Sequence, residues 1–238
     1  MIPALRSLLF PARHLERLCR QGQAPPAICR YLAARQAAAP LSAPWKPLRL
    51  VVFDTETTGL DPRKDRMLSI GAVSIVQGSI QVGDSLELMV NNSSRQDRKA
   101  IEVHGIVPSE TREGQPEAAA VEAFLDYLGS DVLVGHHVGF DIAMIERAAQ
   151  RMAPGFRLYN PRIDTAQLLR RMEGGSPVHQ PGSMQGYNLD ALCERYHIAK
   201  NDRHTAWGDA FLTAQLLLRA LYFMRDKDRR LLRDLTGG

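Results

Sequence analysis

Apolar residues occur along the chain in short runs that polar residues, glycine and proline interrupt. The segment 48–56 is a nearly continuous apolar run that ends in acidic residues, which predicts a central strand buried on both faces. Segments rich in β-branched residues flank Gln77–Gly78 and Gly83–Asp84, so two further strands, joined by tight turns and paired antiparallel, are expected within 67–90. The run 131–137 predicts another strand, and a short strand is expected around 162–164.

Apolar residues at helical spacing follow the first three strands. They predict helices over 116–128, 140–152, 165–172, 188–198 and 205–225, with a loop rich in Gly, Pro, Ser and Gln over 174–186. Strands that come first as a meander and then alternate with helices indicate an α/β fold. We expect a mixed sheet with helices on both faces.

The first 47 residues have a different pattern. Apolar residues at helical spacing over 3–35, with arginines between them, predict short amphipathic helices interrupted at Pro11 and at Pro25–Pro26, and 36–47 is expected to be a linker. We therefore divide the chain into a basic, partly helical extension, 1–47, and a domain, 48–238. Up to Arg49 the chain has eight basic residues and one acid, Glu16. The extension could bind nucleic acid, dock a protein partner or pack on the domain as a brace.

Composition narrows the class of protein. The chain has 238 residues, 45% of them hydrophobic, and a formal net charge of +4, which excludes a disordered or collagen-like protein and permits an anionic partner. Cys19, Cys29 and Cys193 are odd in number and lack a CxxC spacing, so we expect neither a disulfide framework nor a zinc site. No segment is typical of a signal peptide or membrane anchor. We therefore expect a cytoplasmic protein without a membrane partner.

Two acids end the first predicted strand, in the segment DTETTG that begins at Asp54. Asp54 and Glu56 are two residues apart, so their side chains leave the same face of the strand roughly 7 Å apart. Buried carboxylates are costly without a compensating charge, and a hard divalent cation such as Mg²⁺ or Mn²⁺ supplies one. Alternatively, the two acids cap the turn that leads into Thr57–Thr58–Gly59.

Two further segments place acids where apolar elements begin. In GHHVGFD, Asp141 stands where a strand gives way to a helix, and in HTAWGD, His204 precedes a helix that contains Asp209. If all of 204–209 were helical, the two side chains would be off-axis by roughly 140°, so His204 must lie on the lead-in to share a site with Asp209. Taken singly, Asp141 could be a helix N-terminal residue and His204 an exposed histidine.

The order DTETTG, GHHVGFD and HTAWGD resembles the three motifs of the DEDDh, or DnaQ-like, 3′-to-5′ exonucleases. The likeness covers roughly 48–225 and includes the segments IEVHGI, RIDTAQLLRR and YNLDALCERYHI. It implies an RNase H-like mixed five-stranded sheet flanked by helices, preceded here by a helical extension. It also implies that two divalent metal ions, Mg²⁺ or Mn²⁺, are held by four acids: Asp54, Glu56, Asp141 and Asp209. His204 is then the general base, and an ordinary histidine pKa near about 6.5 suits that role.

The resemblance also implies a site for the terminal nucleotide. The residues that match are Thr57, Thr58, Gly59, Leu60, His104 and Phe140. Structural interpretations are also open: Leu60 and Phe140 as core residues, the two threonines as turn formers and His104 as a loop histidine. Asp164 matches a further family position, but we expect it to cap the next helix. Two residues depart from the family pattern: His137 stands where an asparagine is usual, and Ser69 where a glutamate is often found.

The resemblance implies a metal-dependent 3′-to-5′ exonuclease. Such an enzyme releases nucleoside 5′-monophosphates from single-stranded nucleic acid ends, and we expect these ends to be DNA, in replication or repair. The alternatives are an RNA exonuclease of the RNase T or oligoribonuclease kind and a non-catalytic nucleic-acid-binding scaffold. The sequence contains no GxxxxGK[ST] segment, which argues against a P-loop nucleotide hydrolase.

Overall fold

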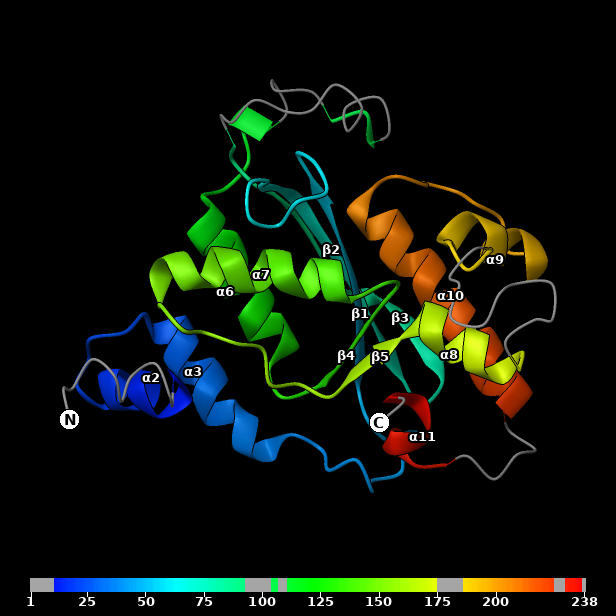
Figure 1. Ribbon diagram of the computed structural model, residues 1–238, viewed down its shortest axis with the longest axis horizontal. Helices are drawn as coiled ribbons and strands as arrows, with labels where there is room; N and C mark the ends of the chain where they lie inside the picture. The colour runs from blue at the N-terminus through cyan, green and yellow to red at the C-terminus, as the bar shows by residue number, and fades with distance from the viewer. Residues whose placement is uncertain (1–10, 93–103, 107–110, 175–185, 225–229, 237–238) are drawn as a thin grey trace.

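A five-stranded mixed sheet forms the centre of the molecule in the computed structural model, which describes residues 11–92, 104–106, 111–174, 186–224 and 230–236 (Figure 1). The strand order is β3-β2-β1-β4-β5. β1 (Leu50–Thr57) pairs antiparallel with β2 (Met67–Val76) and parallel with β4 (Val132–Gly135). β3 (Ser79–Met89) continues the meander, and β5 (Arg162–Asp164) extends the parallel half. The predicted mixed sheet is confirmed.

Helices cover both faces of this sheet (Figure 1). α6 (Glu117–Leu128) and α7 (Gly139–Met152) lie on one face, and α8 (Thr165–Met172), α9 (Leu189–Arg195), α10 (Ala206–Met224) and α11 (Leu232–Thr236) lie on the other. Side chains alternate along β1, so Val51 and Phe53 join the first core while Leu50 and Val52 join the second. The five-residue helix α11 is absent from the sequence prediction.

The β2–β3 hairpin confirms one predicted turn and corrects the other. Gln77 and Gly78 form the turn, with φ of 52° and 79°. Gly83–Asp84 forms no turn, because β3 runs through it and the pairing with β2 shifts register near Ser74. The Asp84 carboxylate accepts hydrogen bonds from Arg49 at 2.8 Å and from the hydroxyl of Ser74 at 2.6 Å. A glycine next to an aspartate favours a bulge as well as a turn.

The described part of the N-terminal extension packs against α6. It contains α2 (Pro11–Arg20), α3 (Pro26–Ala34) and the 3₁₀ helix η1 (Arg35–Ala37). The predicted interruption at Pro25–Pro26 is confirmed, because α2 ends at Arg20 and α3 begins at Pro26, where proline is well tolerated in a first turn. Pro11 is the first described residue, so the interruption predicted there stays a prediction. Buried apolar side chains of both helices join the core beneath α6 and α7, and Arg30 pairs with Asp126 at 2.6 Å. This packing is that of a brace. Residues 3–10 of the predicted helices lie outside the described residues.

Cys19 and Cys29 form a disulfide between α2 and α3, with Cα atoms 5.4 Å apart. The expectation that the cysteines form no disulfide is therefore wrong for this pair. The pairing depends on how two helices pack, which the spacing of cysteines along the sequence does not reveal. The cysteine count consequently gives no support for a reducing compartment.

Part of the predicted linker, 43–45, lies beside the C-terminal segment 230–232. The backbone N–H of Trp45 donates to the carbonyl of Arg230, and that of Leu232 donates to Ala43. The predicted linker is thus hydrogen-bonded to the segment that begins α11. Among the described residues, no helix is long and apolar enough to cross a bilayer. The predicted loop 174–186 falls almost wholly outside the described residues.

Candidate active site

Three carboxylates meet at the end of β1. The side chains of Asp54 and Glu56 leave β1 on the face that α10 covers, the face of Val52. Asp209 lies in the first turn of α10. Each of the three acids offers an oxygen, and these oxygens lie within 4.8 Å of one another. The structure therefore brings together three of the four acids that the sequence analysis singled out.

Close backbone packing puts Asp209 at this position. Gly71 of β2 lies opposite Asp54 in the antiparallel ladder. A Cβ atom at Gly71 would lie 2.1 Å from the backbone nitrogen of Trp207, so only glycine leaves room for the start of α10. The first turn of α10 therefore rests on the sheet beside β1, and Asp209 faces Asp54.

The fourth acid, Asp141, lies in the first turn of α7, where a negative charge is favoured by the helix dipole. Its Oδ1 accepts hydrogen bonds from the backbone N–H of Thr55 at 3.0 Å and from the Thr55 hydroxyl at 2.6 Å. Thr55 stands between Asp54 and Glu56 on β1, so Asp141 reaches the strand from the opposite layer. Its charge helps to raise the pKa of Asp54 and of Glu56, so it acts on these two acids although it is not one of the three whose oxygens lie within 4.8 Å of one another.

Burial close to other acids favours the protonated form of each carboxyl group. Burial and then the charge of Asp141 hold the pKa of Asp54 well above its usual range. Burial and the charge of Asp209 raise the pKa of Glu56 to about 8, and burial raises the pKa of Asp141 to about 7. Burial also raises the pKa of Asp209, and the neighbouring Arg203 opposes that rise. A cation among these groups would relieve their desolvation and mutual repulsion.

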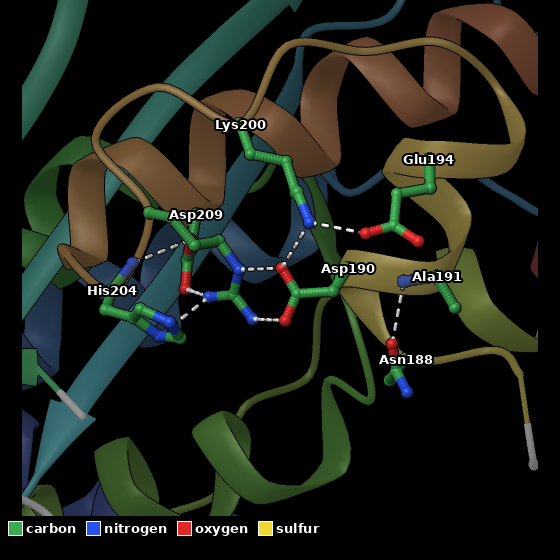
Figure 2. A network of polar contacts seen from close by, with 8 residues as sticks. Asn188, Asp190, Ala191, Glu194, Lys200, His204 and Asp209 are labelled. Atoms are coloured by element: carbon green, nitrogen blue, oxygen red, sulfur yellow. Dashed lines mark hydrogen bonds and ion pairs between the residues drawn. The ribbon is translucent and has the colours of Figure 1, made fainter.

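Arg203 places one positive charge beside the acids. Figure 2 shows the network of polar contacts around Asp209, Asp190 and Lys200. The Nη1 of Arg203 donates to Oδ2 of Asp209, and its other nitrogens donate to both carboxylate oxygens of Asp190 in α9, at 3.0 and 3.3 Å. Lys200 lies 3.8 Å from Asp190 as well. The side chain of Arg203 is 20% exposed and that of Asp209 is 8% exposed, so this ion pair is largely desolvated.

His204 lies on the lead-in to α10, as its proposed role requires. Its backbone has a φ of 67°, and its N–H donates to Oδ1 of Asp209 at 3.3 Å. The Nη1 of Arg203 is 3.3 Å from Nδ1 of the His204 ring. Because an arginine N–H can only donate, this ring nitrogen carries a lone pair here. The ring is partly exposed and lies close enough to His104 to influence its pKa.

The loop that follows β1 exposes one large apolar side chain. Leu60 is 88% exposed, so the interpretation of this residue as a core residue is wrong. The hydroxyl of Thr57 donates to the carbonyl of Gly59 at 2.7 Å, and that of Thr58 donates to Asp65 at 2.9 Å. Both threonine hydroxyls therefore act as donors within the loop and hold it in shape.

His104 is buried, and Phe140 is half-buried. The Nδ1 of His104 accepts a hydrogen bond from the backbone N–H of Ile106 at 3.0 Å, and its Nε2 has no hydrogen-bond partner among the described residues. Burial lowers the pKa of His104, which favours a neutral ring with the hydrogen on Nε2. The backbone of Thr57 partly opposes the lowering of this pKa, although no acceptor among the described residues lies within hydrogen-bonding distance of Nε2. A bound ligand would supply an acceptor. Phe140 is half-buried and packs on the core beneath α7.

Three neighbouring residues have structural roles. Asp164 caps α8 by accepting the backbone N–H of Gln167 at 3.2 Å, as expected. The ring of His136 contacts the hydroxyl of Thr165 at 2.9 Å and the carbonyl of Tyr187 at 3.0 Å, and burial lowers its pKa to about 3. His137 is exposed with a φ of 54°, a conformation that asparagine and histidine both adopt more readily than most residues.

The sequence analysis did not single out Arg203, Asp190 or Thr55. Arg203 stands next to His204, and Thr55 stands between the two β1 acids. Their position next to motif residues is the sequence signal that could have identified them. Asp190 lies in a separate helix, and its contact with Arg203 depends on how α9 and α10 pack. No sequence pattern indicates that contact.

Converging acids at the end of the first strand of this mixed sheet define a nuclease with an RNase H-like fold. A family model described as Exonuclease matches residues 51–217. The chain therefore belongs to the DnaQ-like exonuclease family, as its motifs predicted. The prediction that the protein is a nuclease is confirmed as well.

Relatives with known names agree with this assignment. The chain is 34% identical over 75% of its length to a DNA polymerase III subunit epsilon-like protein of Rhodobacter capsulatus, of which the match covers 24%. It is 31% identical over 71% of its length to the DNA polymerase III subunit epsilon of Rickettsia felis, of which the match covers 72%. It is 30% identical to a DNA polymerase III PolC-type protein of Thermotoga petrophila, but spans only 12% of that protein.

Solved structures share the fold. Exonuclease X in complex with 5′ overhanging duplex DNA matches 79% of this chain with a TM-score of 0.58 and 21% identity, and 98% of that chain is covered. E. coli exonuclease I in complex with a dT13 oligonucleotide matches 76% of this chain with a TM-score of 0.63 and 18% identity, over 42% of its own length.

Proposed function

We propose that this protein is a metal-dependent 3′-to-5′ exonuclease that releases nucleoside 5′-monophosphates from single-stranded DNA ends. The observation that carries the proposal is the meeting of Asp54, Glu56 and Asp209 within 4.8 Å, with Asp141 beside them and His204 on the adjoining lead-in. Family membership supports the reaction class. The two structural neighbours described above bind single-stranded or overhanging DNA, which supports the choice of substrate.

The acids suit one or two divalent metal ions. All candidate ligand atoms are carboxylate oxygens, the donors that Mg²⁺ and Mn²⁺ prefer, and the raised pKa values show that the cluster lacks sufficient positive charge. Asp54, Glu56, Asp209 and the free oxygen of Asp141 would hold the ions. Bound there, such ions would polarise the phosphodiester and offset the charge that develops on the leaving oxygen.

The protein's own groups would bind and orient the strand end. In our proposal Leu60, which is exposed, packs against the terminal base, and the unpartnered Nε2–H of His104 donates to the terminal sugar. His204 accepts the proton of the attacking water, because its ring already presents a lone pair at Nδ1. That role requires Arg203 to move away from the ring.

Degradation of end-labelled strands tests the proposal. Single-stranded DNA and RNA of matched sequence are incubated with Mg²⁺, Mn²⁺ or EDTA, with the label at either end. We expect mononucleotides from the 3′ end only when metal is present, with DNA degraded faster than RNA. Glu56→Gln should abolish the reaction, while Glu87→Gln, on the exposed face of β3, should retain it. Release from the 5′ end, or inactivity on every strand, would refute the proposal.

A second measurement isolates the role of His204. His204→Gln removes the proton acceptor without removing a carboxylate, so turnover should fall by about 10²- to 10⁴-fold while strand binding persists. A variant with full metal-dependent turnover would exclude His204 from the reaction. The names of the epsilon relatives support a further proposal, that a polymerase is a protein partner. Binding of a partner through residues 1–47 stays a prediction.

A further inference from the structure

A cleft with three arginines among its six lining residues lies between the loop after β1 and the C-terminal part of α7. Its volume is about 370 Å³. We call it the basic cleft, and its lining residues are Arg66, Arg147, Gln150, Arg151, Pro154 and Gly155. Neither the sequence motifs nor membership of the exonuclease family assigns a role to it.

Two elements of the candidate active site, the loop after β1 and helix α7, also border the basic cleft. The backbone N–H of Thr58 donates to the carbonyl of Arg66 at 2.9 Å, so this arginine stands next to the loop that follows Glu56. On the other side, α7 begins at the site with Asp141, and Arg147 follows six residues later, about 9 Å along the helix axis. Arg147 joins the two sides by donating to the carbonyl of Arg63 at 3.4 Å.

The surface around the cleft carries an excess of positive charge. Arg63 and Lys64, in the loop that leads to Arg66, are 84% and 82% exposed, and both pair with the one carboxylate of Asp61, at 3.3 and 3.7 Å. Arg151 forms a two-point ion pair with Glu117, and Arg66 lies 4.0 Å from the same carboxylate. Two arginines therefore share one acid.

Arg147 completes the set of five basic side chains. Its hydrogen bond to the carbonyl of Arg63 involves no acid, so that bond does not neutralise its charge. Against the five basic residues stand Asp61, Asp65 and Glu117, and Asp65 already accepts hydrogen bonds from the loop itself. A polyanion would find several donors here that acids of the protein do not saturate.

The arginines of the N-terminal extension contrast with this cleft. Arg30 forms its ion pair with Asp126 on α6. Arg35 pairs with Glu16 at 2.8 Å and lies over the ring of Tyr159. Arg30 and Arg35 therefore help to hold the extension in place, and their charges are already engaged.

We propose that the basic cleft binds the phosphodiester backbone of the substrate strand on the 5′ side of the terminal nucleotide. This proposal rests on the proposed function. Phosphates recur about every 3.4 Å along a stacked strand and farther apart in an extended one, so the axial separation of roughly 9 Å between Asp141 and Arg147 corresponds to at most two or three nucleotides. No lining residue is aromatic, so we expect the cleft to bind the strand through its phosphate charges, independently of the base sequence.

Salt dependence of binding tests the cleft without any turnover. The combined variant Arg63→Gln, Lys64→Gln, Arg147→Gln removes three charges and spares Arg66 and Arg151, which hold Glu117. The matched control is Arg219→Gln, an exposed residue in the last two turns of α10, on the opposite face of the sheet (Figure 1). The probe is a fluorescently labelled single strand of about 12 nucleotides, in EDTA, with anisotropy measured over a series of salt concentrations.

The slope of log affinity against log salt should become shallower by about 0.7 for each phosphate that the variant no longer neutralises. The affinity of the triple variant at low salt should fall by at least about tenfold, while the control should match the wild type. With Mg²⁺ present, KM for the long strand should rise more than KM for a dinucleotide, which is too short to reach the cleft. An unchanged slope in the triple variant would overturn the proposal.

The outcomes separate this proposal from the proposed function. If no strand is degraded but the triple variant still loses salt-dependent binding, the exonuclease proposal fails and the cleft stands. If degradation proceeds and the triple variant behaves like Arg219→Gln, the cleft proposal fails and the exonuclease stands.

Discussion

The ion pair between Arg203 and Asp209 leads to a quantitative prediction about metal-free protein. Arg203 sets one positive charge against a group of buried acids, and its side chain is only 20% exposed. Replacing it by methionine keeps much of the length of the side chain but removes the charge. Asp209 and its neighbours then remain buried without that cation, while Asp190, which is 45% exposed, reaches solvent more easily.

Removing one partner of a buried ion pair costs about 3–5 kcal/mol. We expect the lower end, about 3 kcal/mol, because Asp209 already has a raised pKa and can take up a proton instead. For a domain of this size each kcal/mol lowers Tm by about 2–4 °C, so Arg203→Met should lower the Tm of metal-free protein by about 6–12 °C. Saturating Mg²⁺ would replace the missing charge and leave only the exposed pair with Asp190, worth at most about 1 kcal/mol.

The assay is thermal unfolding of the wild type and Arg203→Met, followed by circular dichroism in EDTA and over a Mg²⁺ titration. Arg203 competes with the metal for Asp209, so the variant should also gain more Tm from Mg²⁺ and bind it more tightly. Asp190→Asn is the matched control, because it loosens Arg203 but leaves its charge beside the acids. An equal loss of Tm with and without Mg²⁺ would refute the reasoning.

Three further predictions follow from the site. The raised pKa values of Glu56 and Asp141, about 8 and about 7, mean that folded metal-free protein binds more protons than unfolded protein above about pH 4. Its stability should therefore fall as pH rises from about 5 to 8, and urea unfolding in EDTA that shows a rise would contradict this. Thr55→Val removes the 2.6 Å hydrogen bond to Asp141 and should cost about 1.5–3 kcal/mol and most of the activity, with Thr213→Val on α10 as control. Gly71→Ala would place a Cβ 2.1 Å from the nitrogen of Trp207, so it should displace α10 and lower Tm more than Gly83→Ala, where nothing lies within 4 Å.

Elements with strong periodicity could be predicted from the sequence. The apolar run before Asp54 predicted β1 within a few residues, because a strand buried on both faces is apolar throughout. The helical pattern around Asp141 predicted α7 equally well, because a helix buried along one side has apolar residues at helical spacing. The convergence of the β1 acids with Asp209 could be inferred only by adding the family resemblance. Local pattern does not say which helix returns to which strand.

Features that depend on packing could not be predicted in the same way. Gly83–Asp84 has the composition of a turn, but Asp84 is held by Arg49 and Ser74, which makes it part of a continuous strand. The disulfide between Cys19 and Cys29 requires two helices to meet, and the contact between Arg203 and Asp190 requires α9 to lie beside α10. Each depends on residues far apart in the sequence or on side-chain orientation.

The family model matches residues 51–217, but residues on either side of that stretch hydrogen-bond to one another, Trp45 to Arg230 and Leu232 to Ala43. The cooperative folding unit is therefore longer than the matched stretch. A fragment trimmed to 51–217 would lack apolar side chains such as Tyr31 and Leu235, which are at most 3% exposed in the intact protein, and would uncover the core surfaces that they cover. We infer that such a fragment would be prone to aggregate even with every catalytic acid present.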